Sequence, residues 1–242
     1  MSVETPFTKE NLNNYLSALA KEFRRRNGTA IPAEIILVGG ASVLANYGFR
    51  NATYDVDAVI YAGGAMKEAA NLVSDKLGLP NGWLNMDFRK TASYSERLSE
   101  ISVYYKTFSN ILTVRTVAAE FLIAMKLMSG RQYKNDLSDI VGIMWEHQRR
   151  GAPITREAVD RAVTSLYGGW SKIPAVSQDF MRDVFTSRDY KAVYAKIRES
   201  EQSAKKAVLE FDKEHPRSLN EDNINAVIEQ ARLKSLQDRD AR

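Results

Sequence analysis

The chain has 242 residues, of which 44% are hydrophobic, so it can bury a substantial core as one large domain or as a domain with a helical extension. It contains no cysteine, which excludes disulfides, thiol catalysis and cysteine-based zinc sites, and this suits the reducing cytoplasm in which we expect the protein. Its 34 basic and 30 acidic residues leave a net charge of +4, which permits contact with nucleic acid without requiring it.

We expect neither a signal peptide nor a membrane span. The first residues combine no basic region with an apolar one, as a signal peptide would. The most apolar run, 118–128, is interrupted by Glu120 and Lys126 and is far shorter than the ~20 residues that a spanning helix needs.

Residues 8–27 are expected to form an amphipathic helix that ends at Gly28. Its apolar stripe consists of Leu12, Tyr15, Leu16, Leu19 and Phe23. Arg24, Arg25 and Arg26 lie in the predicted last turn. There they either complement the helix dipole as a solvated helix end or contact RNA, and the sequence leaves both interpretations open.

A buried strand is expected at about 34–38, because this run is almost entirely Ile, Leu and Val. Gly39 and Gly40 follow it and precede a helix at about 41–47. A glycine pair between a strand and a helix lets the backbone approach a ligand closely, and the N–H groups at the helix start attract phosphate. The hydroxyl of Ser42 lies beside them in the sequence and is a candidate phosphate contact.

The next predicted strand, about 55–60, begins with two carboxylates, Asp55 and Asp57. Because alternate side chains of a strand point to the same side, both acids project from one face. Like charges this close repel unless a cation neutralises them, and Mg²⁺ prefers carboxylate oxygens. The pair therefore predicts a Mg²⁺ site, with Mn²⁺ as a possible substitute.

The order of strand, Gly-Gly, helix and Asp-x-Asp over residues 35–60 resembles the polymerase-β-like nucleotidyltransferase superfamily. The resemblance implies an α+β fold, in which a mixed sheet is flanked by helices. It also implies an NTP as substrate. Asp55 and Asp57 would hold the metal, and the glycine turn with Ser42 would hold the β- and γ-phosphates.

A helix is expected at about 65–77, followed by the loop 79–87. Trp83 in this loop is either a core side chain or a platform on which a base stacks. A similar Trp-Leu-Asn segment occurs at this point in the AbiEii-like branch of the superfamily. This resemblance implies that Asn85 or Asp87 borders the site.

Residues 102–108 and 111–115 are rich in β-branched and aromatic residues, and Ser109-Asn110 between them predicts a hairpin. Many superfamily members carry a third catalytic carboxylate on a strand here, but residues 101–115 contain no Asp or Glu. This departure favours a branch that uses a downstream lysine and aspartate. Whether Asp87 supplies a third carboxylate stays open.

Two further helices are predicted at about 117–129 and 135–149. Lys126 lies within an apolar stretch of the first, where it either extends to the surface or contacts the NTP phosphates. Asp136 and Asp139 share one face of the second helix. Acids in a first turn also complement the helix dipole, so their position alone is ordinary.

Arg50-Asn-Ala-Thr53, directly before the acid pair, and the downstream series Lys126, Asp136 and Asp139 resemble the AbiEii-type and MenT-type branch. These proteins are nucleotidyltransferase toxins of toxin–antitoxin and phage-defence systems. The resemblance implies that Arg50 and Thr53 bind the nucleotide and that Lys126 stabilises charge. Asp136 or Asp139 would position that lysine or a base. The implied acceptor is RNA, most specifically the 3′ end of tRNA, and the implied partner is a cognate antitoxin.

The resemblance to this branch is weaker than that of residues 35–60 to the superfamily, and it covers roughly residues 30–145. The chain from Thr155 onward is predicted to be nearly all helical. Ser218 and Glu221 predict a capping box for the last helix. We expect a nucleotidyltransferase core with its N-terminal helix over 1–115 and a helical C-terminal domain over 116–242.

Three functions are compatible with the sequence. The first is Mg²⁺-dependent transfer of a nucleotidyl group to RNA by a toxin. The second is a catalytically degenerate subunit that binds nucleotide and a partner, which the missing third carboxylate motivates. The third is nucleotidylation of a small molecule, as in antibiotic modification.

Overall fold

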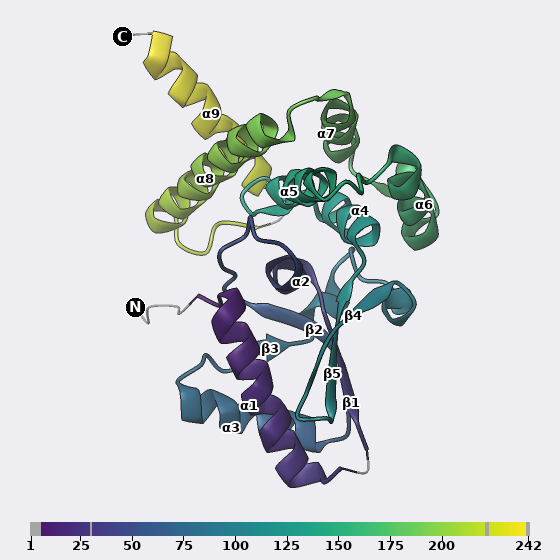
Figure 1. The fold of residues 1–242 in the computed structure, drawn as a ribbon. Coiled ribbons are helices and arrows are strands. Elements are labelled where there is room, and N and C mark those ends of the chain that lie inside the picture. Colours follow the sequence, from purple (N-terminus) through teal and green to yellow (C-terminus); the bar gives the residue numbers. More distant parts are fainter. Residues whose placement is uncertain (1–5, 30, 221–222, 241–242) are drawn as a thin grey trace. The chain divides into compact units, whose positions relative to one another are not determined.

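The computed structural model describes residues 6–29, 31–220 and 223–240. It has the predicted α+β fold, a mixed five-stranded sheet flanked by helices with a helical C-terminal part (Figure 1). The strands are β1 (Ala33–Leu37), β2 (Val56–Tyr61), β3 (Leu84–Asn85), β4 (Ser102–Phe108) and β5 (Leu112–Val117). Their order in the sheet is β3-β2-β1-β5-β4, in which β1 is antiparallel to β2 and parallel to β5.

The helices up to residue 149 agree with the predicted ones to within a few residues, and the chain after Thr155 is largely helical, as predicted. The helices are α1 (Lys9–Asn27), α2 (Gly39–Asn46), α3 (Ala65–Leu77), α4 (Ala119–Ser129), α5 (Asp136–Arg149), α6 (Arg156–Tyr167), α7 (Ala175–Thr186), α8 (Tyr190–Glu214) and α9 (Ile224–Asp240). Short 3₁₀ helices occur at Asp87–Lys90, Glu96–Ser99 and Trp170–Lys172. The predicted capping box before α9 includes Glu221, which lies outside the described residues. No helix in the described part of the chain is both long and apolar enough to cross a membrane.

The chain divides into two compact units. The described residues up to Met128 form the first unit together with Ile154–Lys172, and Ser129–Pro153 forms the second together with the residues from Ile173 onward. The predicted division into domains 1–115 and 116–242 stays a prediction.

Most of α4 and all of α6 group with the sheet in the first unit. Helix α4 follows β5 directly, and its preceding residue Ala118 donates its N–H to the carbonyl oxygen of Ile101. Helix α6 is held by Ser165 Oγ, which accepts from Arg97 Nη1 at 2.7 Å. Contacts between segments distant in sequence therefore decide where these helices belong.

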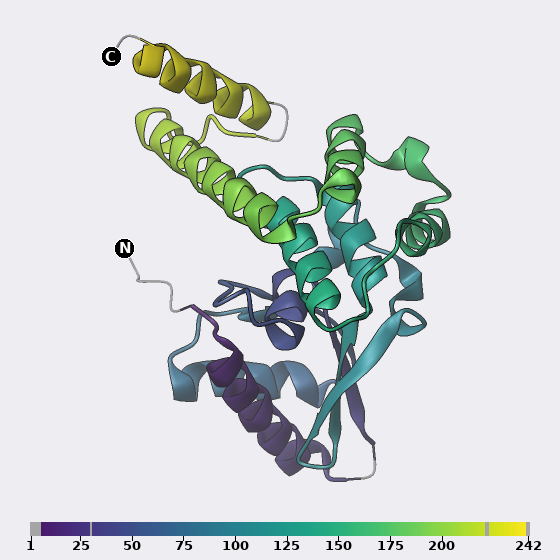
Figure 2. The ribbon, with the colours of Figure 1, turned by 45° about the horizontal axis from the view of Figure 1, so that its top comes forward.

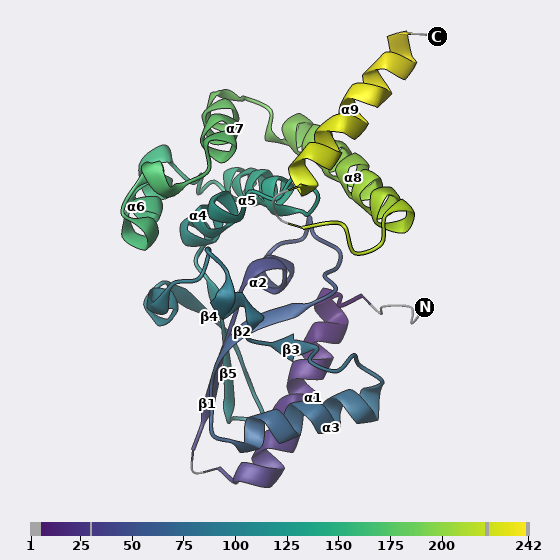
Figure 3. The same cartoon turned by 180° about the vertical axis from the view of Figure 1, so that it is seen from behind.

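The core of the first unit lies between the sheet and the pair α1 and α3, which pack against each other (Figure 3). Ile35 and Leu37 of β1 and Phe23 of α1 are fully buried in it. Trp83 belongs to the same core, with its ring centroid 6.1 Å from that of Phe7. Of the two interpretations of Trp83, the structure therefore supports the core side chain.

The predicted hairpin is confirmed, because β4 and β5 pair antiparallel on either side of Ser109-Asn110. Both turn residues have a positive φ, 51° for Ser109 and 53° for Asn110. Two consecutive residues of this kind are typical of the type I′ turn, whose twist matches that of the flanking strands. The hairpin places β5 beside β1 and completes the sheet around the first strand.

In the second unit, α8 packs against α5, and α9 packs against α8. Figure 2 shows α9 running alongside α8. Helix α8 thus contacts both of the other two helices.

A buried carboxylate joins α1 to α3. Glu22 is 7% exposed and accepts from Arg25 Nη2 at 2.5 Å, Lys76 Nζ at 3.1 Å and Arg26 Nε at 3.3 Å. The hydrogen bonds from Arg25 and then Lys76 lower the pKa of Glu22 to about 2. Arg25 and Arg26 therefore have partners inside the protein, and Arg26 also pairs with Glu68 of α3.

We predict that Glu22→Gln lowers Tm at neutral pH. A carboxyl group whose pKa falls from 4.5 to about 2 on folding stabilises the protein above pH 4.5 and loses that effect as the pH falls through 2. The difference in Tm between variant and wild type should therefore shrink steadily below pH 4.5, as thermal melts followed by circular dichroism would show. Asp75→Asn, at an exposed acid of α3, is the matched control and should leave Tm unchanged. A difference in Tm that is constant from pH 7 to pH 3 would contradict the prediction.

Candidate active site

The turn between β1 and α2 faces the start of β2. Val38 is the residue before α2, and its backbone N–H donates to the carbonyl oxygen of Asp57 at 3.0 Å. Helix α2 begins at Gly39, so the glycine pair is its first turn. The backbone N–H groups that have no intrahelical partner in an α-helix therefore lie next to the acid pair.

Gly39 lies against the carboxylate of Asp57. A Cβ atom added at Gly39 would be 3.8 Å from Asp57 Oδ2, an ordinary contact. The backbone conformation is the stricter demand, since Gly39 has a φ of +53°, which residues with a side chain rarely adopt. Glycine is needed at position 39 because its positive φ lets the chain turn from β1 into α2.

Gly40 is needed for a different reason. A Cβ atom added there would lie 2.7 Å from Thr53 Oγ1 and 2.8 Å from Arg50 Nη2, closer than non-bonded atoms can approach. The side chains of Arg50 and Thr53 therefore occupy the space that a side chain at position 40 would need. The structure thus brings together Gly40, Arg50 and Thr53, which the sequence predicted as nucleotide-binding residues.

Hydrogen bonds connect Arg50 and Thr53 to Asp55, the first acid of the pair. Thr53 Oγ1 donates to Asp55 Oδ1 at 3.2 Å, and Arg50 Nη2 donates to Thr53 Oγ1 at 3.5 Å. Asp55 is exposed and Asp57 is half-buried, whereas Val56 between them is fully buried. The strand was expected to begin at about residue 55, but β2 begins at Val56, so Asp55 lies just before the strand and Asp57 is its second residue.

Ser42 lies inside the fold. It is fully buried, and its hydroxyl accepts the backbone N–H of Val117 at 3.2 Å. This bond joins α2 to the end of β5, so the hydroxyl has a structural partner. Its expected contact with phosphate stays a prediction.

Asn85 of β3 is paired in register with Asp57. Its Oδ1 accepts the backbone N–H of Asp87 at 2.9 Å, and the Asp87 carboxylate pairs with Lys90 Nζ at 2.8 Å. The Asp87 side chain is 74% exposed. Of the two residues expected to border the site, Asn85 is therefore the one in the strand next to the acid pair.

The described residues include no cluster of three or more His, Cys, Asp or Glu side chains that could hold a metal ion. Asp55 and Asp57 would thus serve as a pair. This fits Mg²⁺, which is usually held by one or two carboxylates together with substrate phosphates and water.

Lys126 of α4 is 6% exposed, and Leu127 beside it is fully buried. A lysine that extends to the surface would expose its end, so this burial argues against that interpretation. Asp136 and Asp139 belong to the second unit and are 1% and 2% exposed.

Arg131 Nε donates to Asp136 Oδ2 at 2.8 Å, and Arg131 Nη2 donates to Asp136 Oδ1 at 3.4 Å. This two-point contact gives Asp136 a role in the segment that leads into α5. The catalytic roles predicted for Asp136 and Asp139 stay predictions.

A family model described as a nucleotidyltransferase of unknown function (DUF6036) matches residues 14–144, which is more than half of the chain. The chain belongs to this family. The match supports the nucleotidyltransferase superfamily expected from the glycine pair and Asp-x-Asp, and the AbiEii-type and MenT-type branch stays a prediction. Comparison with curated proteins and with solved structures gave no match.

We predict that Gly40→Ala weakens binding of NTP with Mg²⁺ by about tenfold or more, because the added Cβ displaces Arg50 and Thr53 from the turn. Isothermal titration with each of the four NTPs would measure this. The control is Gly64→Ala, where a Cβ meets nothing within 4 Å and φ is −54°. Equal affinities of the two variants, with both folded, would show that the turn is not the nucleotide site.

Proposed function

We propose that the protein transfers a nucleotidyl group from an NTP to an acceptor and that Asp55 and Asp57 are its metal-binding acids. The observation that carries this proposal is the contact of the glycine turn with the acid pair. Asp57 lies against Gly39, and the Arg50–Thr53–Asp55 series of hydrogen bonds lies over Gly40. The proposed phosphate site and the proposed cation site are thus next to each other.

Each of these residues has a distinct part in the proposed reaction. The N–H groups at the start of α2 and the guanidinium of Arg50 attract the negative charge of the triphosphate. Thr53 orients the carboxylate of Asp55 through its hydroxyl. Asp55 and Asp57 would hold Mg²⁺, which would neutralise charge on the phosphates while an acceptor hydroxyl attacks the α-phosphate and pyrophosphate leaves.

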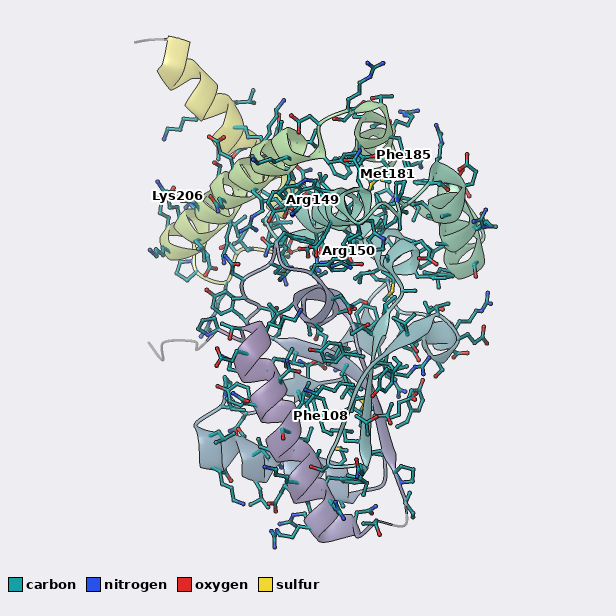
Figure 4. All side chains as sticks on the ribbon, viewed as in Figure 1. Phe108, Arg149, Arg150, Met181, Phe185 and Lys206 are labelled. Carbon is teal, nitrogen blue, oxygen red and sulfur yellow. The ribbon has the colours of Figure 1, made fainter. Side chains whose placement is uncertain are left out.

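The proposed acceptor is the 3′ end of tRNA, in a toxin that a cognate antitoxin controls. Its support is the sequence resemblance together with the net charge of +4. The arginines Arg24 to Arg26 and the adjacent pair Arg149-Arg150 add little, because several of them have partners within the protein. Arg24 Nη1 donates to Ser109 O at 3.2 Å. Arg150, which is labelled in Figure 4, follows the last residue of α5 and pairs with Glu146.

We predict that Asp55→Asn and Asp57→Asn each lower transfer by on the order of a hundredfold or more, because each removes a ligand charge from the metal site. Labelled NTPs, Mg²⁺ and purified tRNA would measure the rate. Asp87→Asn is the matched control and should keep full activity, since Asp87 is exposed and pairs with Lys90. In metal-free buffer neither of the first two variants should melt below wild type, since each relieves repulsion between the acids.

Other outcomes of this assay would replace parts of the proposal. NTP binding without transfer to any acceptor would favour the degenerate nucleotide-binding subunit. Transfer to small hydroxyl compounds but not to RNA would favour a small-molecule nucleotidyltransferase. Full activity of both Asp55→Asn and Asp57→Asn would contradict the assigned site itself.

We predict that Lys126→Met lowers turnover by about tenfold or more, whereas Lys134→Ala does not. Methionine keeps most of the buried volume of Lys126 and removes its charge, and Lys134 is an exposed lysine nearby in the sequence. Turnover would be measured at saturating NTP, well below the Tm of both variants. Equal and mild effects of the two changes would show that Lys126 has no part in the reaction.

A further inference from the structure

The acid pair shares one face of the sheet with two exposed tyrosines. Helices α1 and α3 cover the opposite face, where Val56 and Ala58 of β2 belong to the hydrophobic core. Because alternate side chains of a strand point to opposite faces, Asp57 and Tyr61 lie on the face away from these helices, which we call the outer face. Figures 1 and 3 show α1 and α3 on the same side of β1 and β5.

The pairing register extends the outer face across the sheet. Val59 lies on the same face of β2 as Asp57, and it pairs with Ile36 of β1. Ile36 pairs with Arg115 of β5, and Arg115 pairs with Tyr104 of β4. Paired residues project from the same face, so Arg115 and Tyr104 lie on the outer face. Val59 and Ile36 are fully buried, whereas Arg115 and Tyr104 reach solvent.

The rings of two tyrosines on the outer face are open to solvent. Tyr104 is 63% exposed, whereas Tyr105 beside it packs against the core and donates its hydroxyl to Asn13 Oδ1 of α1 at 3.0 Å. Tyr61 is 41% exposed, and its hydroxyl accepts from Ser99 Oγ at 3.1 Å, which holds the ring in place. Exposed aromatic rings on a sheet are surfaces on which unpaired nucleobases stack.

Arg115 adds a positive charge beside Tyr104. Its Nε donates to Ser102 Oγ at 2.7 Å, and its Nη2 donates to Ser102 O at 2.6 Å. Its Nε also lies 4.0 Å from Glu34 Oε2, at the limit of an ion pair. Within the described residues, Arg115 Nη1 makes no hydrogen bond. An arginine that is fixed in this way and keeps a donor suits a phosphate.

The dimensions of the outer face favour a ligand of several nucleotides. Tyr61 is four residues beyond Asp57 on β2, roughly 13 Å along the strand. Strands β1 and β5 lie between β2 and β4, so Tyr104 is roughly 14 Å across the sheet from β2. A single strand of nucleotides spans these distances, whereas a small molecule at the acids cannot also contact both tyrosines.

We propose that the outer face binds the unpaired 3′ end of the acceptor RNA, with nucleobases stacked on Tyr104 and Tyr61 and a backbone phosphate at Arg115. The inference rests on the proposed function, in which RNA is the acceptor, and it names the part of the RNA that the sheet holds. Stacking tolerates any base, but it needs a free base face. The site therefore selects unpaired nucleotides over a duplex, whose bases stack on one another.

The test measures binding of a fluorescein-labelled single-stranded RNA by fluorescence anisotropy, without NTP and without Mg²⁺. We expect wild type to bind this RNA more tightly than a blunt-ended duplex of the same sequence. Tyr104→Ala should raise Kd roughly tenfold, and Tyr104→Trp should keep the wild-type Kd, because an indole ring also stacks on a base. The matched control is Val103→Ala. Val103 is 47% exposed on the same strand, but it pairs with Thr116 and so lies on the opposite face.

Tyr61 and Arg115 give two independent readouts. Tyr61→Ala should raise Kd, whereas Tyr61→Phe keeps the ring and should bind RNA as wild type does. Arg115→Gln should reduce the slope of log Kd against log salt concentration by about 0.7, the effect of losing one phosphate contact with a single strand. Since Arg115 also holds Ser102, this variant would be measured well below its Tm.

In the transfer reaction, Tyr104→Ala should raise KM for RNA and leave KM for NTP unchanged. A rise in KM for NTP with unchanged binding of RNA would overturn the proposal and assign the tyrosine to the NTP base. Wild-type Kd values in both Tyr104→Ala and Tyr61→Ala would also overturn it, as would equal affinity of wild type for single-stranded and duplex RNA.

Binding without NTP separates this inference from the proposed function. Binding of RNA that depends on Tyr104, in a protein that transfers no nucleotide, would support the outer face as an RNA site and contradict the proposed function. Transfer to RNA that is insensitive to both tyrosines would support the proposed function and overturn this inference.

Discussion

One backbone hydrogen bond sets the geometry on which the candidate site depends. Val38 donates its N–H to the carbonyl oxygen of Asp57, so the end of β1 is joined to the start of β2. The chain must then turn at once into α2, which Gly39 allows through its positive φ. As a result the open end of a helix and a pair of carboxylates lie next to each other, which is what recognition of a metal-bound triphosphate requires.

The surrounding structure holds this turn in place. Ser42 joins α2 to the end of β5, and β5 is the parallel neighbour of β1. On the core side, Glu22 of α1 accepts from Lys76 of α3 and so joins the two helices. Glu22 also accepts hydrogen bonds from Arg25 and Arg26. Arginines that suggested an RNA contact in the sequence thus have structural partners, and the case for an RNA acceptor rests on the resemblance and the net charge.

Most of the structure of the first unit could be predicted from local sequence patterns. The apolar run of β1, the Gly-Gly turn and the Ser109-Asn110 hairpin are set by neighbouring residues, so they could be read from the sequence. Contacts between distant segments could not. That α6 groups with the sheet depends on contacts such as that of Arg97 with Ser165. Glu201 of α8 is buried and accepts from the first backbone N–H groups of α5, but nothing in the sequence of α8 distinguishes it from the exposed glutamates around it.

The most direct test of the central claim is a crystal structure with a non-hydrolysable NTP and Mn²⁺, located by its anomalous scattering. We expect the ion at the carboxylates of Asp55 and Asp57, with the triphosphate beside Gly39 and Gly40 and within reach of Arg50. An NTP bound at another surface, or a Mn²⁺ ion that contacts neither Asp55 nor Asp57, would contradict the proposed site.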